Sequence, residues 1–166
     1  IFGDYKLSDI PNTCSSAIKA VKDLNLNYIT IHINSGLKAL QAAKKVSGKT
    51  KLIGVTVLTS LDNKSLKEIG FDKDVKKLVL HQARLAKKAK LDAIVCSPHE
   101  IKIVKKVFKK EIIVPGIRFI GEAKGDQKRV MTPKQALKNG ATALVMGRSL
   151  TGNIKKNIHK LIKELN

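Results

Sequence analysis

The sequence predicts an α/β fold built around a parallel sheet. Short runs rich in valine and isoleucine, apolar on both faces, recur along the 166 residues, and longer amphipathic stretches separate them. Strands buried on both faces are typical of parallel sheets, and a strict alternation of strands and helices requires right-handed crossovers. We count six βα units without a linker or low-complexity stretch between them. We therefore expect a single domain over residues 1–166.

Each element follows from a local pattern. The apolar runs predict strands at residues 1–6, 28–33, 52–57, 93–96, 112–114 and 143–146. Apolar residues repeated at intervals of three and four predict helices at residues 14–24, 74–89, 101–108 and 153–165. One more helix begins at Thr132, followed by Pro133, and ends at Asn139 and Gly140, because these are typical start and stop residues.

Two architectures accommodate six βα units: a doubly wound open sheet, and a (β/α)8 barrel of which this chain supplies the last six units. The chain begins inside an expected strand and without a methionine. This beginning favours a TIM barrel whose N-terminal part is missing, so that residues 1–166 form an incomplete barrel.

Composition narrows the choice of partners. The net charge is +20, and only four of the 33 basic residues are arginines. The lysines are spread over every expected helix, and aromatic residues make up only 4% of the chain. Nucleic-acid sites usually gather basic residues into one patch and use aromatic rings for stacking. A solvated lysine-rich surface is therefore favoured, and we expect no nucleic-acid partner.

The sequence also favours a cytoplasmic location. No apolar run approaches the roughly 20 residues that a membrane-spanning helix needs, so we expect no membrane association. The two cysteines, Cys14 and Cys96, lie far apart without the CxxC spacing of a redox or zinc site. Such sparse cysteines are typical of a reducing compartment. The histidines lack ligand spacing, so we expect no metal site.

The first expected strand carries a lysine between carboxylates. Asp4 and Lys6 lie two apart and so project from the same face, and Asp9 follows after a short turn. Active sites of βα barrels lie at the C-terminal ends of the strands. Carboxylates hold a neighbouring lysine as the ammonium, which can stabilise developing negative charge and deliver a proton. The same spacing also fits a plain ion pair at a strand end.

A second group of residues suits an anion. The long glycine-rich loop at residues 115–131 carries Arg118, Gln127, Lys128 and Arg129, and the last expected strand ends in Gly147 and Arg148. Phosphate sites of βα barrels lie in the loops after the last two strands. Glycine allows a close approach of backbone N–H groups, and arginine adds a forked donor. We expect a phosphate-binding site here.

Taken together, these segments resemble the orotidine 5'-phosphate decarboxylase family. DYKLSDIPNT resembles the family's DxKxxDIPNT signature. The segments IHINSG, VTVLTS, DAIVCSPHE, VPGIR, GDQKRVMTP and MGRS follow in the family's order and cover nearly the whole chain. The resemblance implies a (β/α)8 barrel that converts orotidine 5'-phosphate to uridine 5'-phosphate (UMP) and CO2 in pyrimidine biosynthesis, with no cofactor.

The resemblance also implies roles for individual residues. Lys6 would donate the proton to C6 of the pyrimidine, and Asp4 would lie beside the substrate carboxylate. Asp9 and Thr13 would belong to an active site shared across a homodimer, and Thr59 would contact the pyrimidine. The phosphate-binding positions would be Arg118, Gln127, Gly147 and Arg148.

Departures from the family pattern leave alternatives open. The first two βα units of the family are missing, and with them an aspartate that holds the ribose and a second lysine of the charge network. We therefore expect little or no activity from these 166 residues alone. The DxKxxD motif also occurs in decarboxylases and aldolases that act on ketose phosphates with Mg²⁺. A non-catalytic basic domain that binds nucleic acid is the alternative from another class.

Overall fold

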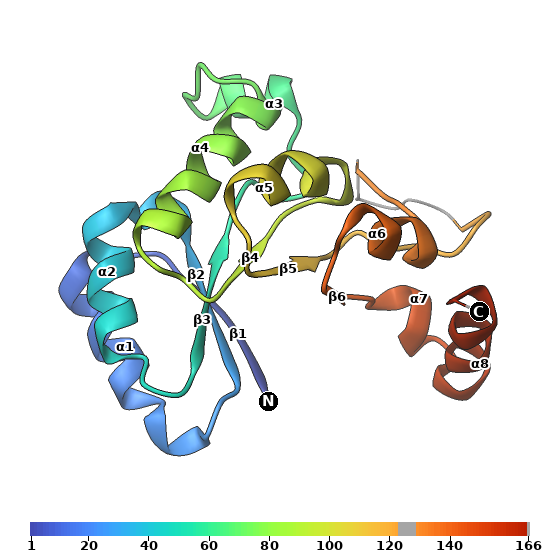
Figure 1. Ribbon diagram of the computed structural model, residues 1–166, viewed down its shortest axis with the longest axis horizontal. Coiled ribbons are helices and arrows are strands. Elements are labelled where there is room, and N and C mark those ends of the chain that lie inside the picture. The colour runs from blue at the N-terminus through green and yellow to red at the C-terminus, as the bar shows by residue number, and fades with distance from the viewer. Residues whose placement is uncertain (123–128, 166) are drawn as a thin grey trace.

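Six strands form one curled parallel sheet in chain order, in a computed structural model that describes residues 1–122 and 129–165 (Figure 1). The strands are β1 (Phe2–Leu7), β2 (Tyr28–His32), β3 (Lys51–Val55), β4 (Ala93–Val95), β5 (Glu111–Val114) and β6 (Ala143–Leu144). Each strand pairs in parallel with the next one along the chain. The predicted parallel α/β architecture is confirmed, and every strand begins and ends within two residues of its expected limits.

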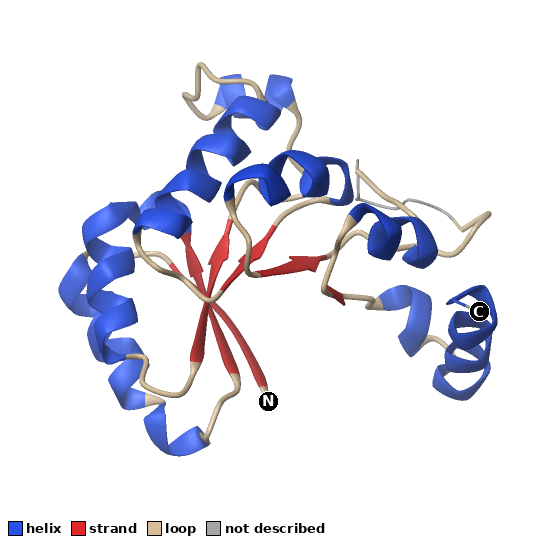
Figure 2. Cartoon of the chain, in the orientation of Figure 1, coloured by secondary structure: helices blue, strands red, loops and turns tan. Residues whose placement is uncertain are grey.

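Helices lie along the outer side of the curled sheet, and the last two lie past its β6 end (Figures 1 and 2). They are α1 (Pro11–Ala20), α2 (Gly36–Val46), α3 (Asn63–Glu68), α4 (Val75–Lys88), α5 (Ile101–Val107), α6 (Pro133–Asn139), α7 (Arg148–Thr151) and α8 (Ile154–Leu165). Within residues 1–122 and 129–165 there are also short 3-10 helices: η1 (Lys22–Leu24), η2 (Ile33–Ser35) and η3 (Pro98–Glu100). Six βα units thus form part of a (β/α) barrel, with β1 and β6 at the two ends of the sheet (Figure 1).

Capping residues set the limits of the helices. The Asp74 carboxylate accepts the N–H of Lys77 at 2.8 Å at the start of α4, and Gly140 ends α6 with φ of 108°. The single helix expected at residues 14–24 is instead two elements, because Pro11 starts α1 earlier and the chain leaves the α-helical conformation at Val21. The sequence patterns did not predict helices α2 and α3.

Side chains of the middle strands alternate between two apolar layers. Leu52, Ile94 and Ile112 are fully buried in the main core with the helices. Their neighbours Ile53, Ala93 and Ile113 form a second buried cluster. Burial on both faces explains why these strands read as continuous apolar runs.

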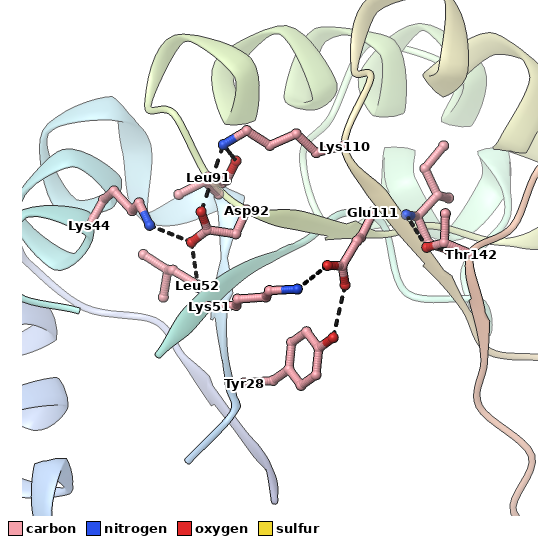
Figure 3. Close-up of polar contacts among 10 residues, drawn as sticks. Tyr28, Lys44, Lys51, Leu52, Leu91, Asp92, Lys110, Glu111 and Thr142 are labelled. Atoms are coloured by element: carbon pink, nitrogen blue, oxygen red, sulfur yellow. Dashed lines mark hydrogen bonds and ion pairs between the residues drawn. The ribbon is translucent and has the colours of Figure 1, made fainter. Parts of the chain in front are cut away.

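Charged side chains join neighbouring strands at the N-terminal end of the sheet (Figure 3). The Asp92 carboxylate, just before β4, accepts the N–H of Leu52 at 2.9 Å and pairs with the Lys44 ammonium. Glu111, which begins β5, accepts the hydroxyl of Tyr28 at 3.0 Å and pairs with Lys51. These carboxylates therefore connect the first residues of β2, β3 and β5 with one another and with α2.

The last helix leaves an apolar stripe uncovered. Ile154, Ile158 and Ile162, spaced four apart on α8, are 58%, 42% and 53% exposed. Lysines occupy other positions of this helix, and the Lys160 ammonium lies 4.3 Å from the centre of the Phe119 ring. Across the described residues, none of the helices has the length and hydropathy to span a bilayer.

Candidate active site

Strand β1 departs from regular pairing where Lys6 lies. Gly3 pairs with Ile29 and Leu7 with Ile31, so four steps along β1 match two along β2. Within this bulge Lys6 has φ of 49°, in the left-handed region that residues other than glycine rarely adopt. Such backbone strain costs about 1–3 kcal/mol and clusters at functional sites.

Asp4 and Lys6 form an ion pair in this bulge. The Lys6 Nζ lies 2.6 Å from Asp4 Oδ2, with the two side chains 45% and 52% exposed. The buried Thr30 of β2 supports the pair: its Oγ1 accepts the N–H of Lys6 at 2.8 Å and donates to Asp4 Oδ1 at 3.0 Å. The structure thus confirms the expected juxtaposition of Asp4 and Lys6, and adds Thr30, which no motif in the sequence marks.

His32, at the C-terminal end of β2, lies in the field of this ion pair. Burial lowers the pKa of its imidazole, the charge of Lys6 lowers it further, and the opposing effect of Asp4 is smaller. His32 is therefore held in the neutral form at pH 7. It adds a polar group beside Lys6 without adding positive charge.

Asp4 and Lys6 line a cavity of about 420 Å³ at the C-terminal ends of the strands. Thr59, from the loop after β3, lies in the same cavity. The other lining residues are mostly apolar: Phe2, Val55, Val57, Leu58, Val95, Cys96, Pro115 and Val145. A mostly apolar wall with a few convergent polar groups suits a small, flat ligand with a charged substituent.

A larger cavity of about 750 Å³ lies at the opposite end of the sheet. It is lined by the ends of α1 and α2 and the first residues of β2 and β3, with Lys22, Lys49 and Lys51 as its charged residues. It contains no residue of the Asp4–Lys6 pair. Size alone therefore does not mark the site, and the smaller cavity holds the reactive groups.

The expected phosphate-binding residues occupy the loops after β5 and β6. Arg118 follows β5, and its N–H donates to the carbonyl of Met131 at 3.1 Å. Gly147 precedes α7, and Arg148 begins that helix. Glu122 ties the two loops together, because its carboxylate accepts the N–H of Phe119 at 3.2 Å and the hydroxyl of Ser149 at 2.6 Å. Gln127 and Lys128 lie outside the described residues.

Arg129 corrects an expectation drawn from the sequence. The sequence assigns it to an anion site with its loop neighbours, but its guanidinium turns inward and is 11% exposed. Nη1 lies 2.7 Å from Oε2 of the buried Glu100, and Nη2 donates to the carbonyl of Leu58 at 2.8 Å. Because Leu58 also lines the smaller cavity, Arg129 anchors the end of the 115–131 loop to the cavity wall.

Asp9 and Thr13 lie apart from the cavity. Asp9 is exposed between β1 and α1, and its carboxylate accepts the N–H of Ile10 at 2.7 Å. Thr13 is exposed on α1. Neither residue lines the cavity, and neither makes a hydrogen bond or ion pair with Lys6 among the described residues. Across residues 1–122 and 129–165, no three His, Cys, Asp or Glu side chains gather as a metal-ligand set would.

Sequence comparisons agree with this geometry. The model of the orotidine 5'-phosphate decarboxylase / HUMPS family matches residues 1–157. The chain belongs to this family. Orotidine 5'-phosphate decarboxylase of Wolbachia from Brugia malayi is 46% identical over 97% of this chain and 73% of its own length. The enzyme of Erythrobacter litoralis is 44% identical over 91% of this chain and 68% of its own length.

Solved structures of the orotidine 5'-phosphate decarboxylase family share the fold. The crystal structure of the Lactobacillus acidophilus enzyme superposes with a TM-score of 0.84 at 31% identity, covering all of this chain and 75% of that one. The Methanocaldococcus jannaschii enzyme, solved with the inhibitor BMP, gives a TM-score of 0.74 at 24% identity, which speaks for the fold alone. It covers 98% of this chain and 72% of that one. These matches give no support to a ketose-phosphate enzyme or a nucleic-acid-binding domain.

Proposed function

We propose that this chain carries the catalytic machinery of an orotidine 5'-phosphate decarboxylase, which forms UMP in pyrimidine biosynthesis. The observation that carries the proposal is the Asp4–Lys6 pair, with 2.6 Å between its charged atoms, in a cavity at the C-terminal ends of the strands. Family membership and curated relatives of that name support it.

The chemistry follows from the two charges. The substrate carries a carboxylate on C6 of its pyrimidine, and Asp4 disfavours that negative charge in the bound state. When the bond to the carboxylate breaks, CO2 leaves as a neutral molecule and its bonding electron pair stays on C6. The Lys6 ammonium stabilises this carbanion and transfers a proton to it, which forms the C6–H bond of UMP. Water then returns a proton to the Lys6 amine.

Binding groups surround this centre in the proposal. Thr59 holds the pyrimidine from the cavity wall, and the phosphate is bound by Arg118, Gln127, Gly147 and Arg148. The phosphate is remote from C6, so its binding energy can offset the cost of placing two carboxylates together. This arrangement needs no metal or organic cofactor.

Asp9 and Thr13 complete the site of a partner subunit in our proposal. Asp9 is exposed just before α1 and Thr13 is exposed on it, and neither lines the cavity of its own chain. A homodimer would therefore use them across its interface. We also propose a cytoplasmic enzyme, because Cys14 and Cys96 are both free thiols, as is typical of a reducing compartment.

Removal of the Lys6 ammonium tests the proposal. We expect Lys6→Ala to lower kcat at least about a thousand-fold, because it removes both the proton donor and the charge beside C6. Release of CO2 from orotidine 5'-phosphate would be measured for the 166-residue chain and for a version preceded by two βα units of the Wolbachia relative. We expect strong activity only in the longer version. A folded longer version no faster than its Lys6→Ala variant would refute the proposal.

A further inference from the structure

One hydroxyl connects both members of the Asp4–Lys6 pair. Thr30 lies in the middle of β2, where it pairs with Ile53 of β3, and its side chain is 1% exposed. Its Oγ1 accepts the backbone N–H of Lys6 and donates to Oδ1 of Asp4. A hydroxyl has one proton to donate and two lone pairs to accept with, so one rotamer satisfies both bonds.

The contacts form a closed ring around the bulge. From Thr30 the ring runs to Oδ1 of Asp4, and from Oδ2 of the same carboxylate to the Lys6 ammonium. It then returns through the Lys6 side chain to its backbone N–H and so to Thr30. Within the bulge, between the paired residues Gly3 and Leu7, the N–H of Lys6 thus reaches a side chain of β2 rather than its backbone.

We propose that Thr30 is a positioning residue that holds Lys6 in its left-handed conformation and thereby fixes the ammonium relative to the cavity. Thr30 is suited to this because a β-branched side chain on a central strand has little rotational freedom. Thr30 is not among the residues that line the cavity in the described chain, so it acts through Lys6 and Asp4. The inference deepens the proposed function and rests on it only for its effect on catalysis.

Two substitutions at the same position separate the hydroxyl from the shape of the side chain. Thr30→Val keeps the branched shape and removes both hydrogen bonds, whereas Thr30→Ser keeps the hydroxyl. A third variant, Thr142→Val, is a matched control. The Thr142 hydroxyl also accepts a backbone N–H at 2.8 Å and donates to a carbonyl at 3.1 Å, but it does so at Ile112, near the N-terminal end of β5.

The first measurement is made on the 166-residue chain and needs no activity. Amide hydrogen exchange and the NMR signals of the Lys6 side chain are compared among the variants. We expect the Lys6 amide to exchange at least about ten-fold faster in Thr30→Val, and at near the wild-type rate in Thr30→Ser and Thr142→Val. An unchanged Lys6 amide and unchanged Lys6 signals in Thr30→Val would overturn the inference.

Asp4→Ala keeps the test decisive if Thr30→Val does not fold. Asp4 is half exposed, so its loss leaves the core intact, but it breaks the ring on the other side of Thr30. We expect faster exchange at Lys6 while the amide of Ile31 stays protected. Equal protection of Lys6 in Asp4→Ala and wild type would count against the inference.

Catalysis supplies the second measurement, in the version of the chain that decarboxylates. A displacement of about 1 Å in a catalytic group costs roughly a hundred-fold in rate. We expect Thr30→Val to lower kcat about 10- to 100-fold with KM changed less than about threefold, and Thr30→Ser to recover most of the loss. A fall in stability without a selective loss of kcat over KM would contradict a positioning role. Exchange effects without any decarboxylation by the wild type would refute the proposed function and leave the inference about Lys6 standing.

Discussion

Charged side chains at the two ends of the sheet have different surroundings. At the N-terminal end, Asp92 accepts a backbone N–H and meets the ammonium groups of Lys44 and Lys110, and Glu111 joins the starts of β2, β3 and β5 (Figure 3). At the C-terminal end, Asp4 and Lys6 share one ion pair on a strained bulge and remain about half exposed. The partly buried Asp92 therefore helps to stabilise the fold, whereas Asp4 and Lys6 stay accessible to a ligand.

The Arg129–Glu100 pair is the exception at the C-terminal end, and its removal should have the largest effect on stability. Arg129→Met leaves the carboxylate of Glu100, which is 2% exposed, without its cation. We expect a loss of about 3–5 kcal/mol in the free energy of unfolding, measured by urea denaturation. Arg118→Met is the control and should cost much less, because Arg118 forms no ion pair among the described residues. A loss below about 1 kcal/mol for Arg129→Met would show that this buried ion pair at the C-terminal end contributes little to stability.

Asp92 tests the N-terminal end directly. Burial alone raises the pKa of its carboxyl group, but hydrogen bonds from Lys44 and Leu52 and the charges of Lys44 and Lys110 outweigh burial and hold the pKa below its ordinary value. The folded protein therefore binds this proton more weakly than the unfolded chain does. The stabilisation is complete above the unfolded pKa of about 4 and is lost as the pH falls through the lower folded pKa.

We accordingly expect Asp92→Asn to lower the free energy of unfolding by about 1.5–3 kcal/mol at pH 7. The difference from wild type should shrink as urea denaturation is repeated below about pH 4. Asp4→Asn is the matched variant at the other end of the sheet, and it should change stability by less than about 1 kcal/mol, because exposed ion pairs contribute little. Equal losses in the free energy of unfolding for the two variants would show that Asp4 and Asp92 contribute equally to stability.

A smaller effect than that of Asp92→Asn is expected from Tyr28→Phe. This change removes only the hydroxyl that donates to Glu111, while Lys51 still pairs with that carboxylate. A hydrogen bond to a charged group contributes about 1.5–3 kcal/mol, and because this carboxylate is partly exposed and keeps Lys51 as a partner, we expect a loss at or below the lower end of that range. Thermal or urea unfolding of the variant would measure it, and a loss as large as that of Asp92→Asn would show that the hydroxyl matters more than the ion pair.

Local patterns predicted much of the fold. Buried apolar runs place all six strands, and the start and stop residues Thr132 and Gly140 agree with the helix that they bound. The spacing of two between Asp4 and Lys6 also predicted their meeting. The family resemblance also implied that Thr59 belongs to the same site. In the structure, Thr59 lines one cavity together with Asp4 and Lys6.

What the sequence did not show depends on contacts between distant segments. Thr30 lies 24 residues from Lys6, and Arg129 lies 71 residues from Leu58. Alternation along β1 gives no sign of the bulge, because a bulge exists only relative to the neighbouring strand. The sequence likewise groups Arg129 with the anion-binding residues of its loop. The guanidinium of Arg129 instead turns inward to the buried Glu100, and local spacing does not identify this partner.

The apolar stripe of α8 has a consequence for how molecules of this protein meet one another in solution. With a net charge of +20, two copies repel at long range, while Ile154, Ile158 and Ile162 attract only at contact. Added salt shortens the reach of the repulsion to about 10 Å at 0.1 M and about 3 Å at 1 M, but it leaves the apolar attraction intact. Ionic strength therefore governs how readily copies of the protein meet through this stripe, and in dilute buffers the net charge opposes such contacts.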